Sequence, residues 1–63
     1  MNPIEVQKAL KGASYPAARD DLAKLAESNG NGDVARALRE SSAAEFGGPD
    51  DVMEALKGEL GGS

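Results

Sequence analysis

The side chains in this sequence best suited to acid–base chemistry are two pairs of neighbouring aspartates, Asp20-Asp21 and Asp50-Asp51. Two carboxylates can act as general acid and general base when their pKa values are driven apart. Each pair, however, falls in the first turn of an expected helix, where negative charge complements the helix dipole. The chain has neither histidine nor cysteine, so no nucleophile–base pair can be assembled. The sequence therefore predicts a protein that is not an enzyme, with no cofactor and no small-molecule substrate.

The segment 27–34 resembles part of a calcium-binding loop between two helices. With Glu27 at the first loop position, Asn29 and Asn31 fall on ligand positions and a glycine falls on the sharp turn. The last ligand is missing, because Leu38 stands where the loop requires a bidentate glutamate. Glycine and asparagine are also the residues that a plain turn favours. We therefore expect a turn without a bound metal.

Two arginines, Arg36 and Arg39, lie on the outer side of a helix expected at 33–42. Together with the helix before it, this segment is compatible with a helix-turn-helix-like domain that reads DNA. The connecting turn is long, however, and nearby acidic side chains would face the phosphates. The net charge of −4 also gives no electrostatic attraction for nucleic acid or anionic membranes. Nucleic-acid binding through helix 33–42 is therefore the alternative to a protein-binding function.

The apolar spacing predicts four short helices that would position these side chains, at 3–11, 17–28, 33–42 and 49–59. In the longest, small and large apolar residues recur at the helical period, and two of the others begin with proline at their first position. The expected fold is all-α, a compact single domain of four short helices over residues 1–60 with a flexible C-terminal tail at 61–63. The core is expected to contain Val6, Leu10, Leu22, Leu25, Leu38, Phe46, Val52 and Leu56.

Local signals fix several helix ends. Asn2 and Glu5 flank Pro3 as in a capping box, and Gly12 suits a left-handed helix terminator. We expect Asp33 to cap the third helix. In contrast, Gly58 either ends the last helix or is tolerated inside it.

The length of 63 residues limits the stability of the domain. A core of this size rarely supplies more than roughly 3–5 kcal/mol of net stability. Without cysteine or histidine the chain has no disulfide and no zinc site, so stability must come from helix packing or from self-association. No apolar run approaches the ~20 residues of a membrane span, and no signal peptide precedes the first helix. The sequence therefore predicts a cytoplasmic protein.

The remaining function class is recognition, so we expect a protein-binding or regulatory module. Ile4 lies off the apolar stripe of the first helix, and either packs against the chain end or contacts a partner. The candidate partner contacts are Ile4, Arg36, Arg39 and Met53. The partner is an unidentified protein or a second copy of the chain.

Nearly the whole chain resembles a small bacterial family known as domain of unknown function 2795. The residues that carry the resemblance are Asn2 to Gly12, Tyr15-Pro16-Ala17, Asp20-Asp21-Leu22, Ala26 to Gly30, Val34, Ala37-Leu38, Glu45-Phe46 and Pro49 to Val52. The resemblance implies a stand-alone or appended small domain with no established activity, and it carries over no catalytic residues. The chain departs from the family pattern at Ala18 and Gly48, where side chains that cap helices are common. It also departs at 41–43, so the path of the loop 41–48 stays open.

Overall fold

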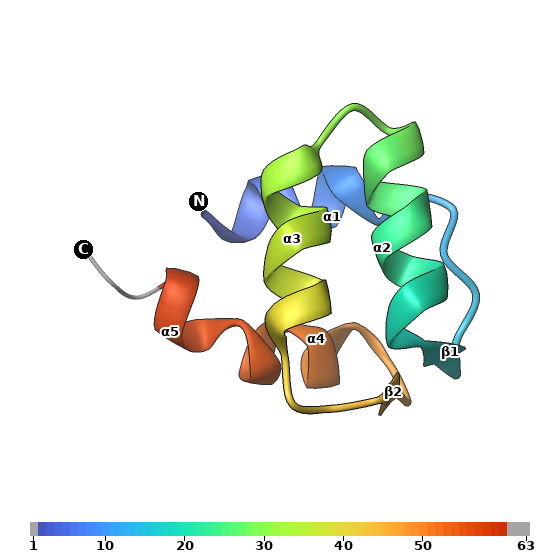
Figure 1. The fold of residues 1–63 in the computed structure, drawn as a ribbon, viewed down its shortest axis with the longest axis vertical. Helices are drawn as coiled ribbons and strands as arrows, with labels where there is room; N and C mark the ends of the chain where they lie inside the picture. Colours follow the sequence, from blue (N-terminus) through green and yellow to red (C-terminus); the bar gives the residue numbers. More distant parts are fainter. Residues whose placement is uncertain (1, 61–63) are drawn as a thin grey trace.

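The computed structural model describes residues 2–60, and the expected tail at 61–63 lies outside these residues. Helices make up most of the described chain, and two very short strands lie among them (Figure 1). The elements are α1 (Pro3–Ala9), β1 (Ala17–Ala18), α2 (Arg19–Ser28), α3 (Gly32–Glu40), β2 (Glu45–Phe46), α4 (Pro49–Ala55) and α5 (Lys57–Leu60). All four expected helices are present. The first three are shorter than expected, and the fourth runs to Leu60 but is divided into α4 and α5.

The start of α1 confirms the expected capping box. The amide of Glu5 donates to Oδ1 of Asn2 at 2.9 Å, and the amide of Asn2 donates to Oε2 of Glu5 at 3.1 Å. Pro3 occupies the first turn, where its missing N–H costs nothing. The helix ends at Ala9, two residues earlier than expected, and Gly12 follows with a φ of +90°.

The expectation of an all-α fold is wrong in one detail, a two-stranded antiparallel sheet. Ala17 pairs with Phe46 and Ala18 pairs with Glu45. The amide of Arg19 extends this contact by donating to the carbonyl of Ala44 at 2.8 Å. Because Phe46 is 1% exposed, the burial of its ring brings the backbone of the 41–48 loop beside residues 17–18. These two residues are therefore extended, and α2 starts at Arg19 instead of residue 17.

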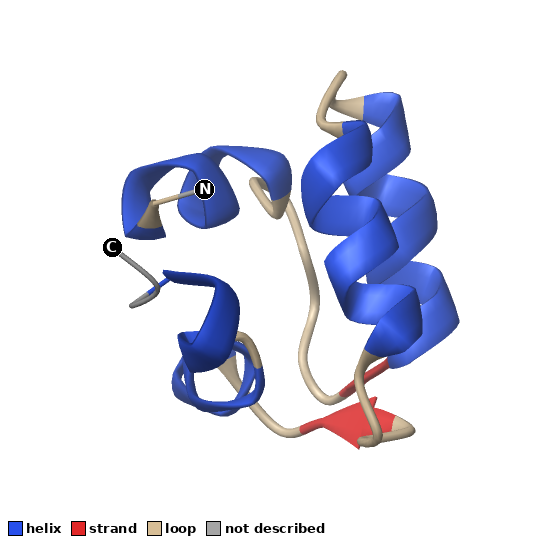
Figure 2. Cartoon of the chain, turned by 60° about the vertical axis from the view of Figure 1, so that its left-hand side comes forward, coloured by secondary structure: helices blue, strands red, loops and turns tan. Residues whose placement is uncertain are grey.

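Helices α2 and α3 lie side by side and form the largest packed unit (Figures 1 and 2). The cap of α3 is Asn31, whose Oδ1 accepts from the amide of Val34 at 3.2 Å. The expected cap, Asp33, is wrong, since it lies inside the first turn of α3. Between the two helices the alanines Ala23, Ala26 and Ala35 are almost completely buried, and such small side chains allow close approach of the helix backbones.

The core contains seven of the eight expected residues, and Leu25 is the exception. Leu25 is half-buried, whereas Ala23 on the same helix is fully buried. The inner face of α2 is thus centred on small side chains that face α3, and the larger leucine is left at its edge. The buried apolar residues are Val6, Ala9, Leu10, Leu22, Ala23, Ala26, Val34, Ala35, Ala37, Leu38, Phe46, Val52 and Leu56.

The last part of the described chain turns back towards α1. Helix α4 begins at Pro49, and Gly48 before it provides no side-chain cap. Instead, Oδ2 of Asp51 accepts from the amide of Gly47 at 2.9 Å. The helix is interrupted at Leu56, and Gly58 is tolerated inside α5. In the part of the chain that the structure describes, no helix has both the length and the hydrophobicity needed to cross a membrane.

Candidate functional site

An apolar groove of about 150 Å³ lies between α1 and α4. Figure 2 shows the two helices together on the side of the molecule away from α2 and α3. The segment that links α1 to β1 contributes Tyr15 to the same hollow. The lining residues are Val6, Gln7, Leu10, Tyr15, Pro49, Val52 and Met53.

The groove has a buried floor and a more exposed rim. Val6 and Val52 are each 1% exposed and form part of the hydrophobic core. Tyr15 and Met53 are half-buried and pack against that core. The volume is close to that of an apolar cavity that holds one benzene molecule, and it is well below the roughly 300–1,000 Å³ of small-molecule pockets. The groove is therefore sized for one large apolar side chain.

Two polar groups stand at this apolar surface. Burial raises the pKa of the Tyr15 hydroxyl above its usual value, and the protonated hydroxyl can both donate and accept a hydrogen bond. Gln7 is exposed, and its amide can both donate and accept. Neither side chain forms a hydrogen bond with another described residue. Both are thus available to a chain that lies over the groove.

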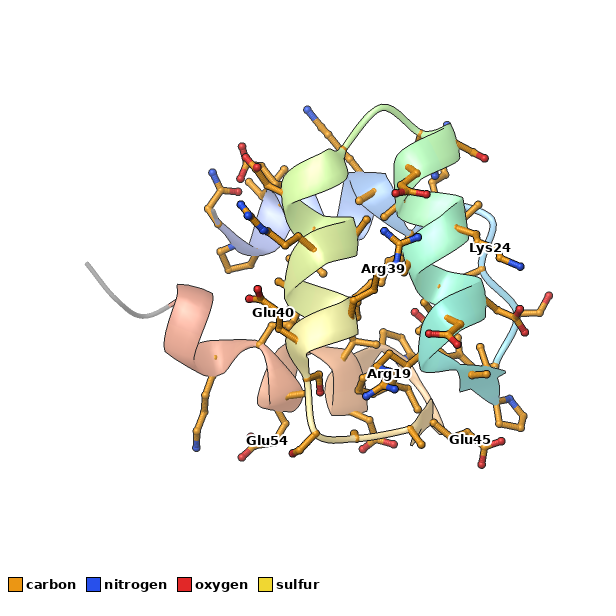
Figure 3. The ribbon with its side chains drawn as sticks, viewed as in Figure 1. Arg19, Lys24, Arg39, Glu40, Glu45 and Glu54 are labelled. Atoms are coloured by element: carbon orange, nitrogen blue, oxygen red, sulfur yellow. The ribbon has the colours of Figure 1, made fainter. Side chains whose placement is uncertain are left out.

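The predicted contact residue Arg39 is held by an ion pair on the other side of the molecule. Its Nη1 and Nη2 atoms donate to the two carboxylate oxygens of Glu27 at 2.7 and 3.0 Å. Figure 3 shows the side chain reaching from α3 towards α2. The hydrogen bonds and positive charge of Arg39 lower the pKa of Glu27, and hydrogen bonding to Glu27 raises the pKa of Arg39. This ion pair joins α2 to α3. The guanidinium of Arg39 already has a carboxylate partner, so it is less available to bind an external anion.

The other arginine of α3 is also next to a carboxylate. Arg36 has a side chain that is 80% exposed, and its Nε lies 3.9 Å from Oε2 of Glu40. Such an i, i+4 pair on an exposed helix face contributes little to stability. Both arginines of the would-be recognition helix therefore have acidic neighbours within the chain.

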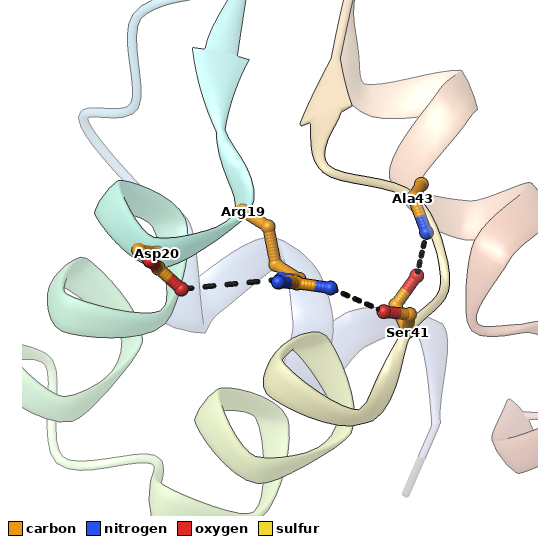
Figure 4. Close-up of polar contacts among 4 residues, drawn as sticks. All are labelled: Arg19, Asp20, Ser41 and Ala43. Atoms are coloured by element: carbon orange, nitrogen blue, oxygen red, sulfur yellow. Dashed lines mark hydrogen bonds and ion pairs between the residues drawn. The ribbon is translucent and has the colours of Figure 1, made fainter.

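Arg19, the residue directly after β1, contacts the loop that follows α3 (Figure 4). Its Nη1 donates to the carbonyl of Ser41 at 2.6 Å, and its Nε lies 3.9 Å from Oδ1 of Asp20. The Ser41 hydroxyl in turn accepts from the amide of Ala43 at 3.2 Å. The Nε atom is buried without a hydrogen-bond partner among the described residues. Arg19 thus fastens the start of α2 to the loop that follows α3.

The asparagines of the 27–34 segment are engaged with the backbone. Asn29 donates from Nδ2 to the carbonyl of Ala9 at 2.7 Å, which ties the α2–α3 turn to the end of α1. Asn31 uses its Oδ1 as the cap of α3. Among residues 2–60 no group of three or more His, Cys, Asp or Glu side chains is placed to hold a metal ion. The two amides therefore have a packing role that the calcium-loop pattern did not indicate.

The four predicted contact residues fall into two places. Met53 lines the groove, and Ile4 lies on α1 one turn before Gln7, which also lines it. Ile4 is 61% exposed, so of the two alternatives for this residue the one in which it packs against the chain end is wrong. Neither Arg36 nor Arg39 lines the groove.

Apart from Met53, none of the residues that line the groove was predicted from the sequence to be part of a binding site. Gln7, Tyr15 and Pro49 lie far apart in the sequence and meet only because α1 and α4 fold to the same side. The one local signal is the position of Gln7 beside Leu10 at i, i+3, which puts a polar residue at the edge of the apolar stripe. That signal alone does not distinguish a groove from ordinary solvent-facing surface.

Comparison with known proteins gives one finding. No curated protein and no solved structure is significantly similar to the chain. The model of a family described as "Protein of unknown function (DUF2795)" matches residues 1–53. This match covers most of the chain, including α1, α2, α3 and most of α4. The chain therefore belongs to this family, and its fold is a helical domain with a small two-stranded sheet.

Proposed function

We propose that the chain is a non-catalytic, regulatory module that binds a protein partner through the groove between α1 and α4. The observation that carries the proposal is a hollow with a buried apolar floor that stays open at its rim. Apolar surface left open beside polar groups is typical of a docking site for another chain. Val6 and Val52 would supply the contact for an anchor side chain, and Gln7 would bond the main chain beside it.

The size and charge of the molecule support a protein ligand over the alternatives. A hollow of about 150 Å³ is too small for a typical cofactor or substrate but suits one anchor residue. Against nucleic-acid binding, the two arginines of α3 each lie next to a carboxylate of the chain. Arg39 pairs with Glu27, and Arg36 lies near Glu40. The chain also carries a net charge of −4. We therefore do not retain DNA binding as a second candidate function.

A photo-crosslinking experiment tests this proposal directly. A small aliphatic amino acid that carries a photoreactive diazirine, too small to fill the groove, is placed at Gln7, which is exposed and lines the groove, and the protein is irradiated in a lysate of the cells that make it. A matched control carries the same group at Lys24, which is exposed on α2 and points away from the molecule in Figure 3. We expect discrete protein adducts, including any with a second copy, from position 7 and not from position 24. Equal adducts from both positions, or none from position 7, would overturn the proposal.

A further inference from the structure

One large apolar side chain stands out on the described surface. Ile4 is 61% exposed, whereas the other large aliphatic and aromatic side chains described in the structure are buried or half-buried. Ile4 lies on α1, three residues before Gln7, which lines the groove. Because residues three apart are neighbours on a helix surface, Ile4 lies next to the groove wall. The same side of the molecule therefore presents an apolar projection and an apolar hollow.

We propose that the occupant of the groove is Ile4 of a second copy of the chain, so that two copies form a symmetric dimer. This inference rests on the protein-binding function proposed above. The groove of about 150 Å³ accepts one side chain of isoleucine size. In an isologous dimer the same patch serves both copies, so each Ile4 enters the groove of the other copy. One projection and one hollow on the same side satisfy this requirement.

One basic side chain beside Ile4 and one acidic side chain beside the groove have opposite charges. On α1, Lys8 follows Ile4 at i+4 and is its neighbour on the helix surface; on α4, Asp50 precedes Met53 by three residues and adjoins the groove wall. Neither Lys8 nor Asp50 forms an ion pair with another of the side chains that the structure describes, those of residues 2–58. When Ile4 of one copy enters the groove of the other, its Lys8 approaches Asp50 of that copy. Two such contacts offset part of the repulsion between two chains of net charge −4.

The available area limits the affinity. A standard interface removes about 800 Å² from each partner, which is roughly a fifth of the 3934 Å² surface of this chain. The molecule measures 28 × 22 × 17 Å, so such an interface would occupy most of one face. We therefore expect a weak dimer whose population rises with protein concentration.

Sedimentation velocity over a roughly hundredfold concentration range tests the dimer. We expect the average mass of the wild-type protein to rise towards that of two copies. Ile4→Asp removes the projection and Gln7→Trp fills the groove from an exposed position, so each should keep the protein monomeric. Ser42→Asp, which adds the same charge at an exposed residue outside the groove, should leave association unchanged. Circular dichroism verifies that every variant is folded.

Mixing the two variants tests the geometry. The Ile4→Asp protein retains an open groove, and the Gln7→Trp protein retains its Ile4. A mixture can therefore form one of the two contacts, and we expect mixed dimers that are weaker than the wild-type dimer. A wild-type protein that stays monomeric, a dimer that survives Ile4→Asp, or a mixture that does not associate would each overturn the inference.

The outcome is separable from that of the proposed function. Crosslinking from position 7 to a different protein, with a monomeric wild type in sedimentation, leaves the groove as a docking site and rejects self-association. Absence of both crosslinks and dimers rejects the two proposals together. A crosslinked product with twice the mass of the chain supports both.

Discussion

The two pairs of neighbouring helices in this domain are closed to different degrees. On α2 and α3, which lie side by side, the alanines Ala23, Ala26 and Ala35 are 0–1% exposed. Between α1 and α4 a groove of about 150 Å³ remains, and most of the residues that line it are larger than alanine, such as Leu10, Tyr15 and Met53. We infer that the small alanine side chains allow α2 and α3 to pack closely, whereas the larger side chains on the short helices α1 and α4 leave a groove between them.

Helix length adds to this difference. Helices α2 and α3 have ten and nine residues, and α1 and α4 have seven each. Two short helices have few turns over which to interdigitate their side chains, and α4 ends where the chain bends at Leu56. The α2–α3 side therefore supplies most of the fold, and the α1–α4 side is left with a surface that a partner can use.

The largest expected effect is on the core beneath α2. Leu22→Ala should lower the free energy of unfolding by about 2–5 kcal/mol, because Leu22 is 2% exposed and its truncation opens a cavity. This loss is comparable with the whole stability expected of so small a domain. Met53→Ala, at the half-buried groove wall, should cost much less. Urea denaturation measures the unfolding free energy of both variants. Equal losses of unfolding free energy would show that the α2–α3 side and the α1–α4 side contribute equally to stability.

A second substitution adds volume to each side instead of removing it. Ala26→Leu should destabilise the protein by about 1–3 kcal/mol, because the contact between α2 and α3 has no space for three more carbon atoms. Gln7→Leu adds an apolar side chain at the open groove and should be neutral or stabilising. Thermal denaturation of the two variants gives the test. A tolerated Ala26→Leu would mean that the α2–α3 contact is looser than the alanine burial indicates.

Two asparagines tie the α2–α3 turn to α1, and Asn29 makes the shorter contact. Asn29→Ala removes the 2.7 Å hydrogen bond to the carbonyl of Ala9, and should cost about 0.5–1.5 kcal/mol. Hydrogen exchange should become faster in α1 than in α2 or α3, because the shorter of these two ties is lost. Ser28→Ala, at an exposed neighbouring residue, is the control and should change neither quantity. Uniformly faster exchange across all three helices would argue against a local role for Asn29.

What the sequence could predict depended on how local each signal was. The capping box of Asn2 and Glu5 and the positive φ at Gly12 involve residues within one or two turns, and both are confirmed. The pairing of β1 with β2 joins residues nearly thirty positions apart, and tertiary contacts, the burial of Phe46 and the hydrogen bonds of Arg19, bring them together.

The same distinction explains the core and the site. Helical periodicity identified a stripe on α2, but whether Leu25 or Ala23 is buried depends on which helix lies beside it. The groove requires Tyr15 and Pro49 to meet, and neither has a local pattern that indicates the other. Met53 was a candidate contact and is a groove residue, whereas Arg39 was a candidate whose ion pair depends on the α2–α3 packing.

The smallest expected effect concerns the ion pair that reinforces the tighter side. Hydrogen bonds from Arg39 lower the pKa of Glu27 in the folded state, so the folded protein holds the Glu27 proton less tightly than the unfolded chain does. The stability from this pair is therefore fully present above the ordinary pKa that Glu27 has in the unfolded chain. It is lost as the pH falls through the lower, folded-state value.

Glu27→Gln should accordingly reduce the difference in unfolding free energy between neutral and acidic pH, and Arg39→Gln should do the same. The change should be small and should shrink further in high salt, because both side chains are about half exposed and solvent screens their attraction. Arg36→Gln is the matched control, since Arg36 lies one turn earlier on α3 and makes only the long contact of 3.9 Å to Glu40. If Arg36→Gln altered the pH profile as much as Arg39→Gln, general charge on α3 would explain the effect, and the pair would not distinguish the α2–α3 side from the α1–α4 side.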